Sequence, residues 1–260
     1  MRVAWLVVGC CGLGCPSSRP RDDEPTPRAH PGAPSDASGG PVSASDGGAD
    51  AANPATIDAA GLVVIDAPIT WTTERAELTL AYRRAHSDPE ATDLVIAPRV
   101  IVLHYTDGGS AKGTREYFDN IRIEVSRPEL ARAGAVNVSS HYLVDRDGTI
   151  YRLQPETQFA RHCLGLNHIA IGIENVGDDK RWPLTDAQVA ANAALVRDLA
   201  ARFPITHLLG HFEVMKFRDH PYFVERDPKY RNDKPDPGAR FLQRVRAEVA
   251  DLRLAGLPQP

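Results

Sequence analysis

The order of apolar and polar positions predicts short strands that alternate with longer helices along most of the chain. Residues 100–103 (Val-Ile-Val-Leu) are the clearest case, because a continuous β-branched run indicates a strand buried on both faces. An Asp-Gly pair at 147–148 separates two other runs and predicts a tight hairpin. The runs interpreted as strands are residues 62–65, 94–96, 100–103, 141–144, 149–153, 169–176 and 208–209.

Three stretches have the apolar spacing of amphipathic helices, namely residues 114–123, 185–203 and 239–254. The second begins with a capping box, Thr185 and Gln188, and ends before Pro204. Residues 73–86 fit a helix or a strand equally well. Strands interleaved with helices predict an α/β (α+β) fold, with one domain at 61–260 built on a central mixed β-sheet flanked by helices.

The first fifteen residues differ in kind from the rest. Their apolar run follows Arg2 and is too short for a membrane span, which takes about 20 apolar residues, so residues 1–15 are interpreted as an export signal. Residues 7–10 (Val-Val-Gly-Cys) resemble a lipoprotein signal with Cys10 acylated, and Cys15 is the alternative acylated residue. An ordinary secretory signal is the other interpretation. A lipid anchor would hold the protein on a membrane without a spanning helix, and we expect the periplasmic side of the outer membrane.

Composition narrows the picture further. Residues 16–60 are rich in Pro, Ser, Gly, Ala and Asp, so they bury too little apolar surface to fold and are predicted to be a disordered tether. The net charge of −4 argues against a nucleic-acid partner, which normally requires a basic surface. Outside the signal Cys163 is the only cysteine, which excludes a disulfide framework in the predicted domain. We expect a monomer.

The candidate chemistry lies where two predicted strands end. His104 follows residues 100–103, and His211 follows residues 208–209 after a glycine, so both should reach one edge of the sheet. Asp236 lies between two prolines just before the last predicted helix. Two imidazoles and one carboxylate suit a single Zn²⁺ ion and leave its fourth position for water. Spacing alone leaves open that each histidine is a hydrogen-bonded core residue.

Five segments in this order resemble the N-acetylmuramoyl-L-alanine amidases of the amidase-2 class, relatives of peptidoglycan recognition proteins and of phage T7 lysozyme. The segments are residues 102–106, 138–148, 161–175, 209–211 and 234–241. The resemblance implies the fold of that class and zinc-dependent hydrolysis of the amide bond between N-acetylmuramic acid and L-alanine, with peptidoglycan or a muropeptide as the substrate. The signal and tether resemble the layout of its lipoprotein members.

The resemblance also implies roles for individual residues. His104, His211 and Asp236 would bind zinc, Glu174 would carry protons, and Lys234 would stabilise the oxyanion. The implied substrate contacts are His162, Asn167 and His141.

Several alternatives stay open. His141 could instead hold a ligand or pack in the core, and His220 could replace His211 at the metal. Cys163 is expected to be structural, because a zinc enzyme needs no thiol nucleophile. The family's His-Ala-Gly is His-Cys-Leu-Gly here, at residues 162–165, which leaves the substrate contacts open. Two functions compete with this one: a non-catalytic peptidoglycan-binding module, and a hydrolase of another cell-wall amide bond.

Overall fold

A computed structural model describes residues 55–57, 62–231 and 233–257. The predicted signal at residues 1–15 and most of the predicted tether therefore lie outside the described residues. In the described part of the chain, no helix combines the length and the apolar character that crossing a membrane requires.

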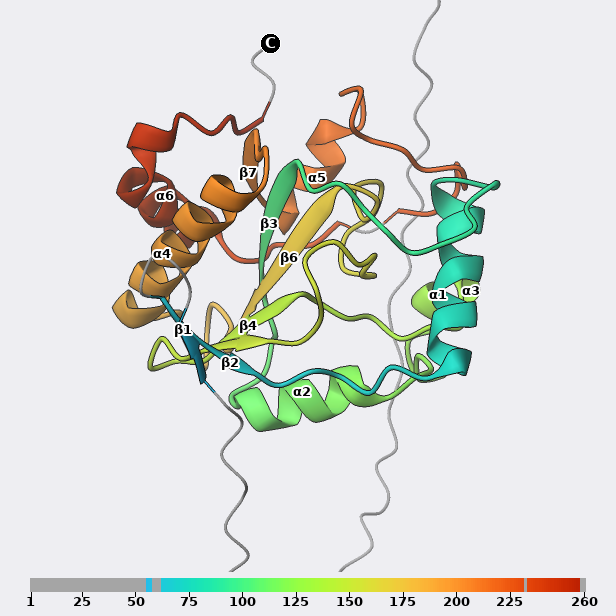
Figure 1. The fold of residues 1–260 in the computed structure, drawn as a ribbon, viewed down its shortest axis with the longest axis horizontal. Helices are drawn as coiled ribbons and strands as arrows, with labels where there is room; N and C mark the ends of the chain where they lie inside the picture. The colour runs from blue at the N-terminus through green and yellow to red at the C-terminus, as the bar shows by residue number, and fades with distance from the viewer. Residues whose placement is uncertain (1–54, 58–61, 232, 258–260) are drawn as a thin grey trace, which may run out of the picture. The chain divides into compact units, whose positions relative to one another are not determined.

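One mixed sheet of seven strands organises the described residues, in the order β1-β2-β5-β4-β6-β3-β7 (Figure 1). The central strands β4, β6, β3 and β7 are parallel to their neighbours within that group, whereas β1–β2 and β4–β5 are antiparallel pairs. The mixed α/β fold is therefore confirmed. The strands are β1 (Ala55–Ile57), β2 (Val63–Asp66), β3 (Val100–Tyr105), β4 (Tyr142–Val144), β5 (Ile150–Arg152), β6 (Ala170–Asn175) and β7 (His207–Gly210).

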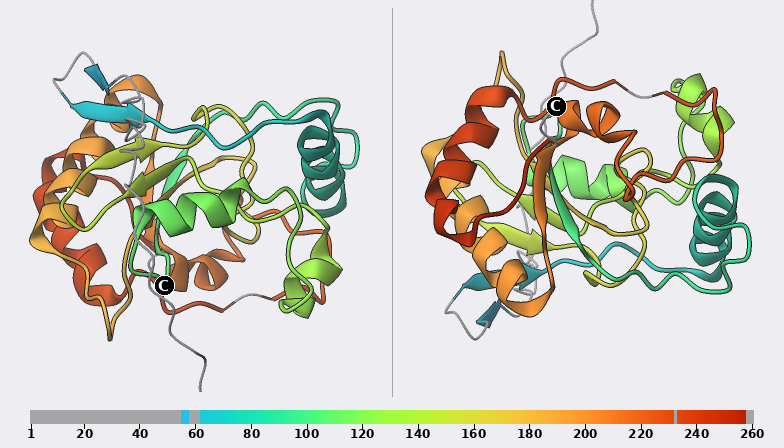
Figure 2. Two further views of the ribbon diagram at one scale, coloured as in Figure 1. Left: turned by 90° about the horizontal axis from the view of Figure 1, so that it is seen from below. Right: turned by 90° about the horizontal axis from the view of Figure 1, so that it is seen from above.

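Helices cover both faces of this sheet. α4 and α6 lie together on one side, while α2 and α5 lie on the other, with α1 and α3 at its periphery (Figures 1 and 2). The helices are α1 (Thr73–His86), α2 (Ala111–Asp119), α3 (Pro128–Ala133), α4 (Asp186–Arg202), α5 (His211–Val214) and α6 (Ala239–Glu248), with 3₁₀ turns η1 (Met215–Phe217) and η2 (Ala250–Leu252).

The core is built from alternate residues of the central strands. Ile101 and Leu103 of β3 pack with α4 and α6, whereas Val100 and Val102 pack with Val214 on the opposite side. These four residues of β3 have no solvent exposure, as the continuous apolar run predicted. Two packed faces fix the position of β3, and the residue at its carboxyl end is fixed with it.

Most predicted elements are present, and their differences have local causes. The capping box of α4 is complete, and the hairpin joins β4 to β5 as expected. Residues 73–86 form a helix, α1, which begins after the capping side chain of Thr72. α2 begins earlier than predicted, because Ser110 caps its amino-terminal end. The Ser110 side chain accepts a hydrogen bond from the Gly113 N–H in the first turn of the helix.

Three expectations differ from the structure in detail, and two short helices were not predicted. Residues 94–96 make an isolated bridge at Val95 and no strand, and β1 lies inside the predicted tether. The last helix, α6, ends at Glu248 and is followed by η2, because Val249 already leaves the helical conformation. Short helices α3 and α5 were not predicted, since each is too short for an apolar period to be visible.

Candidate metal centre and cleft

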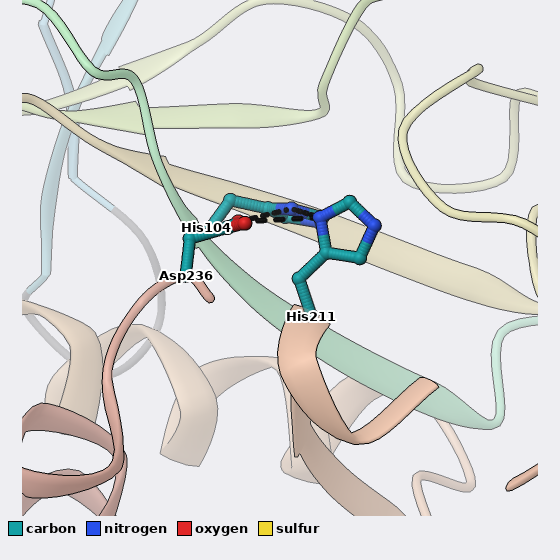
Figure 3. A group of neighbouring side chains, drawn as sticks. All are labelled: His104, His211 and Asp236. Atoms are coloured by element: carbon teal, nitrogen blue, oxygen red, sulfur yellow. Dashed lines mark hydrogen bonds and ion pairs between the residues drawn. The ribbon is translucent and has the colours of Figure 1, made fainter. Parts of the chain in front are cut away.

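Three separate segments bring His104, His211 and Asp236 together (Figure 3). His104 lies in β3, and His211 is the first residue of α5, directly after β7. Because β3 and β7 are parallel neighbours, their carboxyl ends lie at the same edge of the sheet. Asp236 comes from the loop before α6, which is attached to α5 by a 3.0 Å hydrogen bond from the Phe212 N–H to the Asp236 carbonyl. The predicted convergence at one sheet edge is therefore present.

The three side chains present a compact set of ligand atoms. His104 Nδ1 lies 3.0 Å from His211 Nδ1, and each nitrogen lies 3.2 Å from Asp236 Oδ2. A single proton can form a hydrogen bond between only two of these three atoms, whereas a metal cation can bind all three. Ligand atoms bound at about 2.1 Å to a tetrahedral zinc ion are roughly 3.4 Å apart, close to the spacing seen here. The residues present therefore fit one zinc ion.

The protonation states also suit a metal. Burial lowers the pKa of His104 to about 4, so its imidazole is neutral at physiological pH. Burial opposes ionisation of Asp236, but the polar contacts of its Oδ2 atom with the His104 and His211 rings outweigh it and hold the pKa of that carboxyl well below its ordinary value. Metal ligands must be deprotonated, and neutral imidazole with ionised carboxylate is the state that binds zinc.

Glu174 lies beside the triad in the sheet. It is the direct β6 partner of His104 in the parallel pairing of β3 and β6. Its Oε2 atom is inaccessible and has no hydrogen-bond partner among the described residues. Burial, followed by the charge of Asp236, raises the pKa of Glu174 well above its ordinary value. A carboxyl group with a raised pKa next to a metal centre has the properties of a proton carrier.

A cleft of about 1090 Å³ opens onto this centre, and its lining includes all three triad residues together with Glu174 and Lys234. Lys234 is half-buried and belongs to the same loop as Asp236. Other lining side chains come from α1, α2 and the loop after β6. The cleft thus gives a substrate access to both candidate catalytic residues.

The remaining predicted site residues occupy different positions. His162 lines the cleft and lies directly behind His104, with a 3.0 Å contact between His162 Nδ1 and His104 Nε2. Asn167 also lines the cleft, but its Oδ1 atom accepts hydrogen bonds from the backbone N–H groups of His162 and Cys163, at 2.9 and 2.8 Å. Its carboxamide oxygen therefore holds the loop in shape.

His141 is not among the residues that line the cleft. It is fully buried, and both of its ring nitrogens are bonded to backbone, Nε2 to the Gln158 carbonyl and Nδ1 to the Gly172 N–H. This geometry matches the packed-core alternative and leaves no ring atom for a substrate.

Two further residues test the alternatives at the metal. The His220 ring stacks on Phe217 with centroids 4.2 Å apart, and its Nδ1 accepts a hydrogen bond from the Tyr222 N–H. Among the described residues only His104, His211 and Asp236 form a group with metal-ligand spacing. Cys163 is buried, and burial raises the pKa of its thiol, which is the property of an unreactive core cysteine.

Two structural features of the cleft were not predicted from the sequence. The buried Arg161 guanidinium donates to the carbonyls of Leu130, Gly134 and Val136, which ties α3 to the cleft. Asp178 Oδ1 accepts several backbone N–H bonds from residues 180–182 and shapes the loop after β6. The partners of Arg161 and Asp178 cannot be predicted from residue spacing, because they are backbone carbonyl and N–H groups, which every residue type carries.

The fold and the site together define a mixed α/β domain with an open cleft over a two-histidine, one-aspartate candidate metal centre. A family model described as N-acetylmuramoyl-L-alanine amidase matches residues 95–239, more than half of the chain. The chain belongs to that family, as the resemblance of its motifs predicted.

Individual relatives are more distant. The endolysin of Escherichia phage T7 is 31% identical over 100 residues, which is 36% of this chain and 66%, just under two thirds, of the endolysin. Among solved structures, the endolysin amidase LysCS of Clostridium intestinale is 22% identical with a TM-score of 0.46, over 72% of this chain and 95% of that one. The human protein PGRP-IBETAC, solved with a glycosamyl muramyl pentapeptide, is 18% identical with a TM-score of 0.39, over 58% of this chain and 87% of that one.

Proposed function

We propose that the protein is a zinc-dependent amidase that hydrolyses the bond between N-acetylmuramic acid and L-alanine in peptidoglycan. The observation that carries this proposal is the convergence of three buried ligand atoms next to Glu174 in an open cleft. Membership of the amidase family supports the same bond and substrate class.

The chemistry of amide hydrolysis gives each cleft residue a role. His104, His211 and Asp236 would hold the zinc ion, which would supply a water of lowered pKa and polarise the scissile carbonyl. Glu174 takes a proton from the attacking water and gives it to the leaving amine nitrogen. Lys234 places its ammonium group in the cleft, where it stabilises the negative charge that develops on the carbonyl oxygen.

The decisive experiment is mass spectrometry of muropeptides after incubation with the purified protein, with and without a chelator. We expect free stem peptides that begin with L-alanine, together with peptide-free glycan, and no products after chelation. Products cut within the peptide would indicate a hydrolase of another amide bond. Binding of muropeptides without any product would indicate a non-catalytic binding module.

Metal content tests the ligand assignment separately. His211→Ala should abolish tight zinc binding, whereas His220→Ala should leave it unchanged, because His220 stacks on Phe217 outside the triad. A His211→Ala protein that keeps stoichiometric zinc would move the ligand role elsewhere.

We further propose that residues 1–15 direct export and attach a lipid, and that Cys10 or Cys15 is the modified residue. The support is the sequence Val-Val-Gly-Cys at residues 7–10. Metabolic labelling with an alkyne fatty acid in a bacterial host, with Cys10→Ser and Cys15→Ser variants, would identify the residue. If neither the wild-type protein nor the variants take up label, residues 1–15 would be an ordinary export signal without lipid attachment.

A further inference from the structure

Behind the candidate metal centre, two histidines form a continuous hydrogen-bonded chain that ends on a backbone carbonyl. His104 Nε2 lies 3.0 Å from His162 Nδ1, and His162 Nε2 lies 3.2 Å from the carbonyl oxygen of Ala170. His104 and Ala170 are buried, and His162 is 9% exposed, so little water competes for these bonds. The chain connects the first residue of β6 to His104 Nε2, the ring nitrogen that faces away from His211 and Asp236.

The carbonyl at the end of the chain decides where every proton lies. A carbonyl oxygen only accepts hydrogen bonds, so His162 Nε2 must carry the proton of that neutral ring. His162 Nδ1 is then an acceptor, and His104 Nε2 must be the donor to it. His104 Nδ1 is consequently left with a bare lone pair, and this is the atom that faces His211 and Asp236. The opposite tautomer of His162 would place a proton on His104 Nδ1 and block metal binding.

The position of the His162 ring is itself fixed by the chain around it. Its backbone N–H donates to Asn167 Oδ1 at 2.9 Å. Its ring lies against Gly172 of β6, where an added Cβ atom would be only 2.7 Å from His162 Cγ and 2.8 Å from its Nδ1. A strand residue with any side chain would displace the ring, so glycine at this position is what allows His162 to reach His104.

We infer that His162 is a positioning residue that sets the tautomer and orientation of the metal ligand His104, through its hydrogen bond to the Ala170 carbonyl. This inference rests on the zinc site of the proposed function and replaces the expectation that His162 contacts substrate. Groups that orient a ligating imidazole in this way typically contribute 10–100-fold to metal affinity.

Two variants of similar size separate this role from packing. His162→Leu and His162→Asn both replace the imidazole ring by a smaller side chain. The Asn carboxamide oxygen can lie near the position of Nδ1 and accept a hydrogen bond from His104 Nε2, whereas a Leu methyl group cannot. Zinc affinity, measured by competition with a chelating dye, should fall roughly 10–100-fold in His162→Leu and only a few-fold in His162→Asn. His168→Leu is the matched control, because this half-buried histidine of the same segment is outside the group with metal-ligand spacing, and it should keep normal affinity.

Thermal unfolding of each protein without metal reports packing alone. A His162→Leu protein that binds zinc as tightly as wild type, or a His162→Asn protein that loses as much affinity as His162→Leu, overturns the inference. These affinities need no substrate, so an active site that cuts a different bond leaves the inference standing. A wild-type protein without zinc affinity overturns both the inference and the proposed zinc enzyme.

A spectroscopic measurement on the wild-type full chain does not depend on any variant being folded. Imidazole ¹H–¹⁵N correlation spectra with zinc bound should show the proton of His162 on Nε2 and that of His104 on Nε2. A His162 proton on Nδ1 would refute the inference directly.

Discussion

Replacing Glu174 by Gln should separate the chemical step from metal binding. The substitution keeps the shape of the side chain and removes only its ability to accept and release a proton. Glu174 pairs with His104 across the strands but belongs to no group with metal-ligand spacing among the described residues. We therefore expect Glu174→Gln to keep one zinc ion and to bind muropeptides with nearly normal affinity.

The size of the effect follows from the surroundings of the carboxyl group. Its Oε2 atom is inaccessible and unbonded among the described residues, so the amide breaks no hydrogen bond that holds the fold. The lost function is general acid–base catalysis, which typically contributes 10²–10⁴-fold, or about 3–5 kcal/mol of transition-state stabilisation. The loss should appear in kcat and not in KM, because the interaction is made mainly in the transition state.

The assay combines zinc content, turnover of a defined muropeptide and fragment affinity for the same preparation. Glu156→Gln is the control, because this buried carboxylate accepts from Arg202 at 2.8 Å and does not line the cleft. It should lower stability and leave kcat unchanged. Near-normal turnover of Glu174→Gln would mean that another group moves the proton, and loss of its zinc would mean that Glu174 is a ligand.

Three further outcomes are expected. Lys234→Met should lower turnover by roughly 10²–10³-fold, as for loss of an oxyanion donor, with zinc content unchanged in elemental analysis. Removing residues 1–54, which keeps β1, should leave full activity on soluble muropeptides; lost activity would place the removed segment in the fold. Burial disfavours protonated His86, but its hydrogen bonds to Glu225 and the Ala133 carbonyl outweigh this and raise its pKa above 6.5. That stabilisation is complete below about pH 6.5 and is lost as pH rises through the folded-state pKa, so urea denaturation should show the advantage of wild type over His86→Gln shrinking with rising pH. A constant difference would contradict this.

The strands could be predicted from sequence because their buried positions are occupied by apolar residues. Residues 100–103 are apolar on both faces, and the structure leaves none of them exposed. The helix α1 was ambiguous for the opposite reason. Its buried stripe consists of Arg75, Thr79, Tyr82 and His86, which have helical spacing but are mostly polar. Hydropathy cannot identify a buried face that is held by hydrogen bonds.

The candidate site shows the same division between local and distant information. The end of a buried strand and a proline-flanked loop are local features, and they predicted where His104 and Asp236 would lie. The partners of those residues are distant, since the contact between His104 and Asp236 spans 132 positions. The resemblance supplied the grouping, but it named His162 only as a substrate contact. Its position behind His104 depends on the Ala170 carbonyl and on Gly172, which no spacing rule connects to it.

The helix α1 extends this argument beyond the region that matches the family. The family model begins at residue 95, after α1 has ended, yet Tyr82 of α1 lines the cleft. Polar contacts attach the helix to the rest of the domain: Arg75 donates to the Asp119 carbonyl at 2.7 Å, and His86 bonds Glu225 in the loop that leads to Asp236. Hydrogen bonds made by charged side chains are directional, so these contacts orient α1 as well as attach it. α1 therefore contributes Tyr82 to the lining of the cleft, and a protein cut at the family boundary would lose that contribution.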